Sequence, residues 1–280
     1  MVESIKELRL ICEKDTRADR PVSEVIPRFF AIYITWILLH TGITANQVTL
    51  MGFLLGFAGG ILFISGNPLY IFIGSLLLLM NFQLDYVDGE IARYRKSASL
   101  AGRYISTLFG HHLLESWVFV SLAFGVYNAL NDVRYFAFGF AASLSVLLIR
   151  LAVFNTYSGV VEAGLRVTAQ AGVPGQTSVE RTEGELFSPD SYVMSYVSSF
   201  GSIIYKGFEN LLSPGRELML LTAAILDIFI DPFNFLVPFN FIGLFLIFWG
   251  VVTMLAWMTL ATIAIRKRTS EVLFRRLFQK

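Results

Sequence analysis

Long apolar stretches dominate the pattern of hydrophobic and polar positions along this 280-residue chain. A helix needs about 20 mostly apolar residues to cross the hydrocarbon core of a bilayer. Five stretches meet this length with few or no charges, at residues 46–65, 68–84, 113–130, 135–156 and 239–265. A sixth, at 217–234, carries Asp227 and Asp231 near its far end. The pattern therefore predicts an all-α integral membrane protein with six transmembrane helices.

The stretch before the first predicted span is apolar but short. It is entered through Pro27 and Arg28, stays apolar for about 14 residues and ends at His40 and Gly42. A helix of this length suits the membrane interface better than a crossing. We expect an interfacial amphipathic helix over 28–43, with a short seventh span as the alternative.

Composition supports the membrane class, and the basic residues assign the sides. The chain is 55% apolar and 15% charged, against about 25% charged for an ordinary soluble domain. Lys and Arg gather before residue 29, in the turn at 93–103, in the connection at 157–216 and after residue 265, whereas the opposite turns carry only Arg134. Basic residues favour cytosolic loops. Both termini are therefore expected in the cytosol, with the plasma membrane as the location if the protein is prokaryotic.

These assignments divide the chain into four parts. Residues 1–27 form a cytosolic N-terminal segment and 28–43 the interfacial helix. Residues 44–266 form the six-span membrane domain, with a cytosolic insertion at 157–216, and residues 267–280 form a basic cytosolic tail. The net charge of +1 gives no case for a nucleic-acid partner.

Carboxylates lie at the end of the second predicted span. Asp85 and Asp88 are three residues apart and therefore share one helical face, which Gly89 and Ala92 leave small. Two like charges on one face repel each other, and Mg²⁺, Mn²⁺ or Ca²⁺ would neutralise them through hard oxygen ligands. Arg93 lies beside them and would hold a phosphate. The alternative is an ordinary solvated helix end.

The spacing of these residues resembles a known signature, that of the CDP-alcohol phosphotransferase (CDP-alcohol phosphatidyltransferase) family. The fixed residues of that signature are present here as Asp85, Asp88, Gly89, Ala92, Arg93 and Gly102. The segment 43–49 is also similar to the family's first-span entry, although Ala45 replaces its usual proline.

The resemblance implies a fold, an activity and partners. Six helices would surround a polar cavity open to the cytosol. A CDP-linked donor would bind at the aspartates with Mg²⁺ or Mn²⁺, and its phospho-alcohol group would pass to an acceptor hydroxyl with release of CMP, as in transferases of EC 2.7.8 type. The product would be a phospholipid or a related phosphodiester. Membrane lipids would be partners, a lipid hydroxyl is one candidate acceptor, and a homodimer is the usual assembly of such enzymes.

The signature breaks after Gly102. The family carries aspartates where this chain has Ser106 and Gly110. Ser106 would be a weak metal ligand beside Asp85 and Asp88, and Gly110 has no group to accept a proton. Replacement bases follow directly, and they are His111, His112 and Glu115.

Three interpretations of this break stay open. A histidine replaces the base, with Glu115 orienting it or completing the metal set. Alternatively, the protein is a catalytically silent homologue that binds nucleotide, metal or lipid. In the third, the native site was altered by substitution.

Other residues are candidates for binding the donor or the acceptor. Arg150 lies in the fourth predicted span and would bind an acceptor or lipid phosphate, unless it snorkels to the headgroups. Arg103 is a similar candidate, and Asn46 and Thr49 would face the nucleotide unless Asn46 caps its helix. The full set for substrate binding is Asn46, Thr49, Gly89, Ala92, Arg93, Gly102, Arg103 and Arg150.

Overall fold

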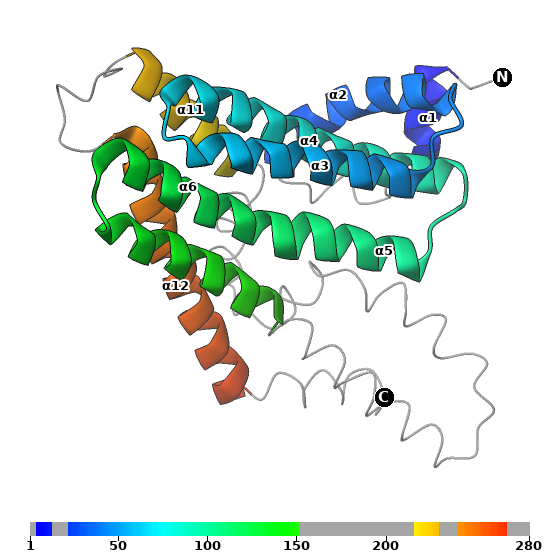
Figure 1. Ribbon diagram of the computed structural model, residues 1–280. Coiled ribbons are helices and arrows are strands. Elements are labelled where there is room, and N and C mark those ends of the chain that lie inside the picture. Colours follow the sequence, from blue (N-terminus) through cyan, green and yellow to red (C-terminus); the bar gives the residue numbers. More distant parts are fainter. Residues whose placement is uncertain (1–3, 13–21, 152–215, 230–239, 268–280) are drawn as a thin grey trace. The chain divides into compact units, whose positions relative to one another are not determined.

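The structure is a computed structural model and describes residues 4–12, 22–151, 216–229 and 240–267 (Figure 1). Every regular element in these ranges is a helix. Five of them are long and apolar enough to cross a bilayer, namely Ala45–Ile64, Pro68–Tyr94, Tyr104–Leu130, Arg134–Leu151 and Phe241–Thr262. The predicted all-helical membrane fold is confirmed. Residues 152–215, which include nearly all of the predicted insertion, and the tail from 268 lie outside the described residues.

The chain divides into two compact units. Residues 1–144 and 209–252 form the first, and residues 145–208 and 253–280 form the second. In the second unit the structure describes residues 145–151 and 253–267, which are helical. Arg150 lies in this second unit, whereas all other predicted site residues lie in the first.

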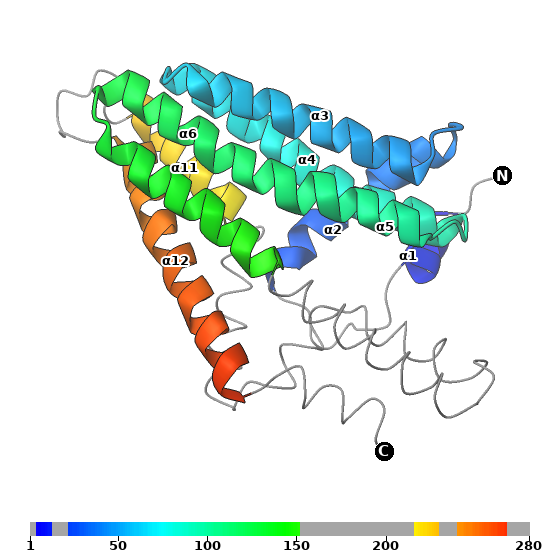
Figure 2. The same cartoon turned by 60° about the horizontal axis from the view of Figure 1, so that its bottom comes forward.

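Helices α3 (Ala45–Ile64) and α4 (Pro68–Tyr94) pack side by side in the first unit (Figures 1 and 2). Small residues allow the approach, since a Cβ at Gly59 would lie 2.7 Å from the carbonyl oxygen of Gly74. Further along α3, Gly60 faces Trp117 of α6 (Glu115–Leu130), and a Cβ there would lie 2.1 Å from its indole nitrogen. Gly59 and Gly60 of α3 thus serve packing between helices of this chain.

Two predicted spans differ from the observed helices at their boundaries. The second apolar stretch ends near residue 84, whereas α4 continues through the motif to Tyr94, and the third helical run begins with α5 (Leu100–Ser106) rather than near 113. The apolar pattern marks only the part of a helix that faces lipid. Beyond it, the backbone keeps its helical hydrogen bonds while polar side chains turn toward other parts of the protein.

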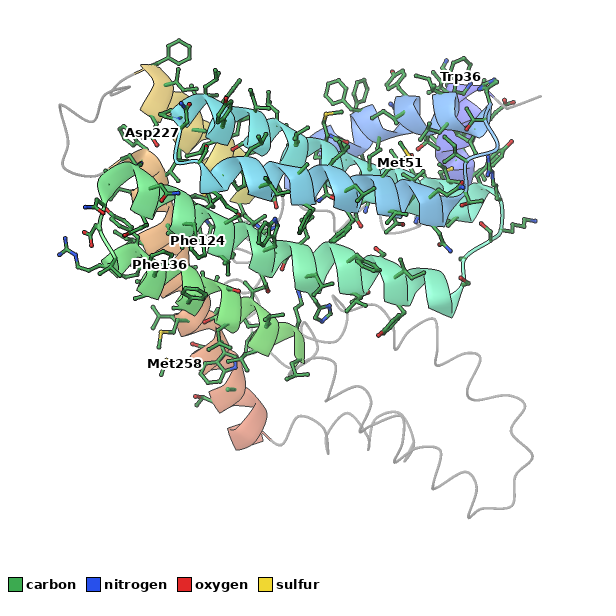
Figure 3. All side chains as sticks on the ribbon, viewed as in Figure 1. Trp36, Met51, Phe124, Phe136, Asp227 and Met258 are labelled. Atoms are coloured by element: carbon green, nitrogen blue, oxygen red, sulfur yellow. The ribbon has the colours of Figure 1, made fainter. Side chains whose placement is uncertain are left out.

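The predicted sixth span corresponds to α11 (Arg216–Phe229), which packs against α4. Its 14 described residues are fewer than a crossing needs, and residues 230–239 lie outside the described part of the chain. The carboxylate of Asp227 accepts hydrogen bonds from the backbone N–H groups of Phe241 (2.6 Å) and Ile242 (3.1 Å) at the start of α12 (Phe241–Lys267). Asp227, labelled in Figure 3, therefore caps the next helix.

Two helices precede α3. The first, α1 (Ile5–Cys12), was not predicted, although Ser4 and Glu7 form the reciprocal hydrogen bonds of a capping box at its start. The hydroxyl and the backbone N–H of Ser4 both donate to the Glu7 carboxylate, and these two bonds hold the pKa of Glu7 below its ordinary value. The second, α2 (Val22–Leu39), begins earlier and ends earlier than the helix expected at 28–43. Its exposed aromatic residues include Trp36 (Figure 3). Its position in the interface stays a prediction.

Candidate active site

Asp88 of the motif lies at the contact between α4 and α3. Its side chain is buried, and its carboxylate accepts a hydrogen bond from the hydroxyl of Thr49. A buried carboxylate without donors would be costly, so this hydroxyl helps to keep Asp88 in place. Thr49 was predicted to face the nucleotide, and the structure brings it to the second motif aspartate.

Asp85 receives its contact from a different helix. The hydroxyl of Ser106, the last residue of α5, donates to Asp85 Oδ1 at 3.3 Å. Ser106 occupies a motif position at which the family has an aspartate. An aspartate at this position would place its carboxylate next to that of Asp85. The two motif aspartates of α4 are thus each contacted by a hydroxyl, one from α3 and one from α5.

Arg93 is held at the end of the same helix. Its Nε donates to the carbonyl oxygen of Cys12 in α1 at 2.7 Å. A Cβ at Gly89 would lie 3.1 Å from Arg93 Nη1, so the absent side chain leaves room for the guanidinium beside the backbone of α4. This contact explains why the motif has a glycine at position 89, because a side chain there would crowd the Arg93 guanidinium.

Asn46 and Gly102 meet between the starts of α3 and α5. A Cβ at Gly102 would lie 3.0 Å from Asn46 Oδ1 and 3.2 Å from the hydroxyl oxygen of Ser99. Asn46 does not cap α3, because Thr44 and Gln47 form the capping box there. The Asn46 amide therefore lies beside the motif glycine, and its role in binding the nucleotide stays a prediction.

Gly110, the second substituted motif position, lies in a π-helix, η2 (Thr107–Leu114), which directly follows Ser106. Such turns are rare and often occur at functional sites. Nδ1 of His112 lies 2.7 Å from the carbonyl oxygen of Thr107. A carbonyl only accepts, so Nδ1 carries the hydrogen and Nε2 of the neutral ring keeps its lone pair. A Cβ at Gly110 would meet no atom within 4 Å, so this position has open space.

Glu115 lies apart from this histidine contact. It is buried, and its carboxylate lies 3.5 Å from the guanidinium of Arg216, which also bonds to Glu217 through Nε at 3.1 Å. The charge pattern had placed Arg216 at the end of a cytosolic connection, but it is the first residue of α11. These contacts favour a structural role for Glu115 over an orienting or metal-binding one.

The hydrogen bonds of Asp85, Asp88 and Arg93 given above involve none of the remaining predicted site residues. The side chains of His111 and Arg103 lie outside what the structure describes, although both residues belong to described helices. Arg150 belongs to the second unit. Ala92 lies on α4 between the aspartates and Arg93.

Within the described ranges, no three His, Cys, Asp or Glu residues gather as a metal site. The donor set that is present consists of two carboxylates and the Ser106 hydroxyl. These are hard oxygen ligands, which suit Mg²⁺ or Mn²⁺ with several ligands left to water or substrate phosphate. The residues therefore fit a divalent cation held jointly with a phosphorylated substrate.

Sequence reasoning missed several partners of the motif. Thr35 of α2 donates to Glu90 Oε2 at 2.6 Å, and both side chains are buried. Cys12 and Arg216 were likewise not expected near the site. The Ser4–Glu7 capping pattern was the available signal for α1, whereas nothing in the local sequence pairs residues so far apart.

Comparison with known proteins agrees with this geometry. The family model for CDP-alcohol phosphatidyltransferases matches residues 42–177, which contain the Asp85–Arg93 motif and its contacts on α3 and α5. Residues 42–177 therefore match the CDP-alcohol phosphatidyltransferase family. This match supports a membrane transferase of EC 2.7.8 type that uses a CDP-linked donor.

A solved structure supports the fold. Phosphatidylinositol phosphate synthase of Mycobacterium tuberculosis in its apo form has a TM-score of 0.53 at 16% identity, over 83% of this chain and 94% of that chain. The same enzyme with CDP-DAG bound has a TM-score of 0.49 at 18% identity, over 84% of this chain and 94% of that one. No curated protein sequence matches this chain.

Proposed function

We propose that this protein transfers a phospho-alcohol group from a CDP-linked donor to an acceptor hydroxyl at the Asp85–Arg93 face of α4, and that CMP is released. The observation that carries the proposal is the contact of each motif aspartate with a hydroxyl from another helix. Thr49 of α3 bonds to Asp88, and Ser106 of α5 bonds to Asp85. Three helices thus support the two carboxylates beside Arg93.

The donor would bind across this face. Asp85, Asp88 and Ser106 would hold a divalent cation, Mg²⁺ or Mn²⁺, which when bound neutralises the pyrophosphate charge. The guanidinium of Arg93 would bond to a phosphate oxygen, since Arg pairs well with such groups. Asn46 would offer its amide to the nucleotide, with Gly102 leaving the space for it.

A base must accept the proton that the acceptor hydroxyl loses during transfer. The acceptor oxygen forms a bond to the phosphorus that carries the alcohol, and the bond from that phosphorus to the oxygen of CMP breaks. His112 is our preferred base, because its Nδ1 faces the Thr107 carbonyl and its Nε2 remains able to accept the proton. Glu115 is less suited because it pairs with Arg216.

The location and partners follow from the charge pattern and the family. The site and both termini would face the cytosol, with membrane lipids around the spans. A lipid product, a homodimer and an acceptor site at Arg150 are further parts of the proposal, and they rest on the family resemblance.

Purified protein in lipid nanodiscs, screened against CDP-linked donors and hydroxyl acceptors, tests the proposal through CMP release. We expect turnover that requires a divalent cation and is abolished in Asp85→Asn. His112→Ala should lose at least about a hundredfold in kcat, as for loss of a general base. A protein that binds donor but never releases CMP would be a silent homologue. Activation by Ser106→Asp with Gly110→Asp would show that the transferase site is disabled.

A further inference from the structure

The short helix α1 packs against the motif helix. Its residues Leu8 and Cys12 are buried and belong to one hydrophobic cluster with Val87 and Ile91 of α4. The neighbouring Leu10 is 73% exposed, so the two faces of α1 differ sharply. The helix lies outside the segment that the family model matches, which begins at residue 42.

The C-terminal residue of α1 makes two polar contacts with the motif turn. The carbonyl oxygen of Cys12 accepts from Arg93 Nε at 2.7 Å, and its thiol donates to the carbonyl oxygen of Glu90 at 3.5 Å. One contact fixes the side chain of the motif arginine, and the other fixes the backbone beside it. α1 is thus attached to α4 at the residue that would bind phosphate.

The orientation of Arg93 depends on this attachment. A guanidinium has five donors in a rigid plane, so fixing Nε limits where the other nitrogens point. Arg93 Nη1 lies next to Gly89, on the α4 face that carries Asp85 and Asp88. An arginine side chain left free would lose more conformational entropy when it binds a ligand.

Helix α2 supports the opposite side of the motif turn. Thr35 donates to Glu90, and the guanidinium of Arg28 lies 4.9 Å from the ring centre of Tyr86. By the 3.6-residue period, the α4 face that carries Asp85 and Asp88 does not include residues 86, 87, 90 and 91, which lie on the other sides of the helix. Contacts from α1 and α2 therefore hold α4 at positions other than Asp85 and Asp88.

We propose that α1 is a positioning element of the active site, whose docking through Leu8 and Cys12 orients Arg93 for the phosphates of the CDP moiety. The inference rests on the proposed function, in which Arg93 binds phosphate. Leu8 and Cys12 touch no substrate and act through Arg93.

A thiol-labelling experiment tests the docking without any activity measurement. Cys12 is the only cysteine in the chain and is buried, so a maleimide reports directly on α1. In full-length protein in nanodiscs, Leu8→Ala should speed labelling at least tenfold, whereas the exposed control Leu10→Ala and the conservative Leu8→Met should not. Arg93→Ala should also speed labelling, because it removes the bond to the Cys12 carbonyl. Equal labelling in all variants overturns the proposal.

Calorimetry with CDP and Mg²⁺ tests the positioning itself. Leu8→Ala should weaken CDP binding about tenfold and raise the donor KM similarly with little change in kcat, as expected for loss of one charge-assisted hydrogen bond in binding. In an Arg93→Ala background the same substitution should have no further effect. An additive loss in that double variant, or an equal loss in Leu10→Ala, would show general destabilisation and overturn the proposal.

The same measurements separate this inference from the proposed function. A parent protein that binds CDP but releases no CMP from any donor contradicts the transferase activity and leaves the positioning of Arg93 supported if the binding results hold. A parent protein that binds no CDP contradicts both.

Discussion

At the scale of single residues, the site depends on hydroxyls that the motif does not include. Thr49 illustrates this, because its hydroxyl donates to a buried motif carboxylate from a different helix. The entry segment of the first span had marked Thr49 as a nucleotide ligand. Its contact indicates a role in holding Asp88 as well.

We expect Thr49→Val to weaken divalent-dependent activity. The change keeps the side-chain volume but leaves Asp88 without this donor, and a hydrogen bond to a charged group contributes about 1.5–3 kcal/mol. The Mg²⁺ concentration for half-maximal CMP release should rise about tenfold. Thr49→Ser is the matched control and should stay near the parent value. An unchanged Mg²⁺ requirement in Thr49→Val would show that this contact does not support the metal ligand.

A second residue-scale prediction restores a family carboxylate. In Ser106→Asp the new carboxylate would face Asp85, whose Oδ1 now accepts from the serine hydroxyl. The two charges repel without metal and bind it together when it is present. The variant should therefore unfold at a lower temperature than the parent in chelator and gain more from added Mg²⁺.

Thermal unfolding with EDTA or Mg²⁺ measures both effects in the same sample. Gly110→Asp is a useful companion, because a Cβ at that position meets no atom within 4 Å and should be tolerated. If Ser106→Asp responds to Mg²⁺ no more than the parent protein, Ser106 does not lie at a metal site.

The sequence predicted some of these residues and not others for identifiable reasons. Asp85, Asp88 and Arg93 lie within nine positions of one helix, so their common surface follows from the helical period. The contacts from Thr35 and Cys12 cross from other helices and leave no local periodic signal. Gly110 was recognised as a broken motif position, but only the structure shows that a side chain would fit there.

At the scale of helices, one ion-pair group joins α6 to α11. Arg216 lies between Glu115 and Glu217 with its side chain 11% exposed, and its guanidinium also lies 6.0 Å from the ring centre of Phe119. Removing one partner of a buried pair typically costs about 3–5 kcal/mol, because the other charge remains uncompensated. This group should therefore fix how α11 attaches to the third span.

We expect Arg216→Met to destabilise the protein more than Glu115→Gln does. The first change leaves two buried carboxylates without their cation, whereas the second leaves Arg216 paired with Glu217. Thermal unfolding in detergent should show this order, and the double variant Glu115→Leu with Arg216→Met should recover part of the loss. The reverse order would mean that Glu115, rather than Arg216, is the main attachment.

Helix boundaries show where apolar patterning stops being informative. The five apolar stretches overlap the five long helices, but the second stretch ends near residue 84, before the motif, and the third begins near 113, after the helix has already started. The extension to Tyr94 carries the motif, and Arg95 just beyond it donates to the carbonyl oxygens of Ile43 (2.6 Å) and Thr41 (2.9 Å). Contacts to the α2–α3 turn, rather than lipid, hold this part of the helix. The functional segment was therefore the part that hydropathy described least well.

At the scale of the whole molecule, the helices define spans but not which side faces the cytosol. The orientation rests on the Lys and Arg residues, which gather at 93–103 and are nearly absent from the turn at 130–134. The two turns lie at opposite ends of the third helical run, so a probe at each one distinguishes the two orientations.

Single cysteines at Ala98 and Val133 test the predicted topology. Both positions are exposed, and Val133 is 68% exposed, so a maleimide would reach either one from its own side. Gly66 would be a poor probe of the same outer side, because its φ is +69° and a Cβ there would lie 2.5 Å from the carbonyl oxygen of Gly125. In intact cells with Cys12→Ser as the background, an impermeant maleimide should label Ala98→Cys only after permeabilisation and Val133→Cys without it. Labelling of Ala98→Cys alone in intact cells would invert the topology, and the Asp85–Arg93 face would then open away from the cytosolic supply of CDP-linked donors.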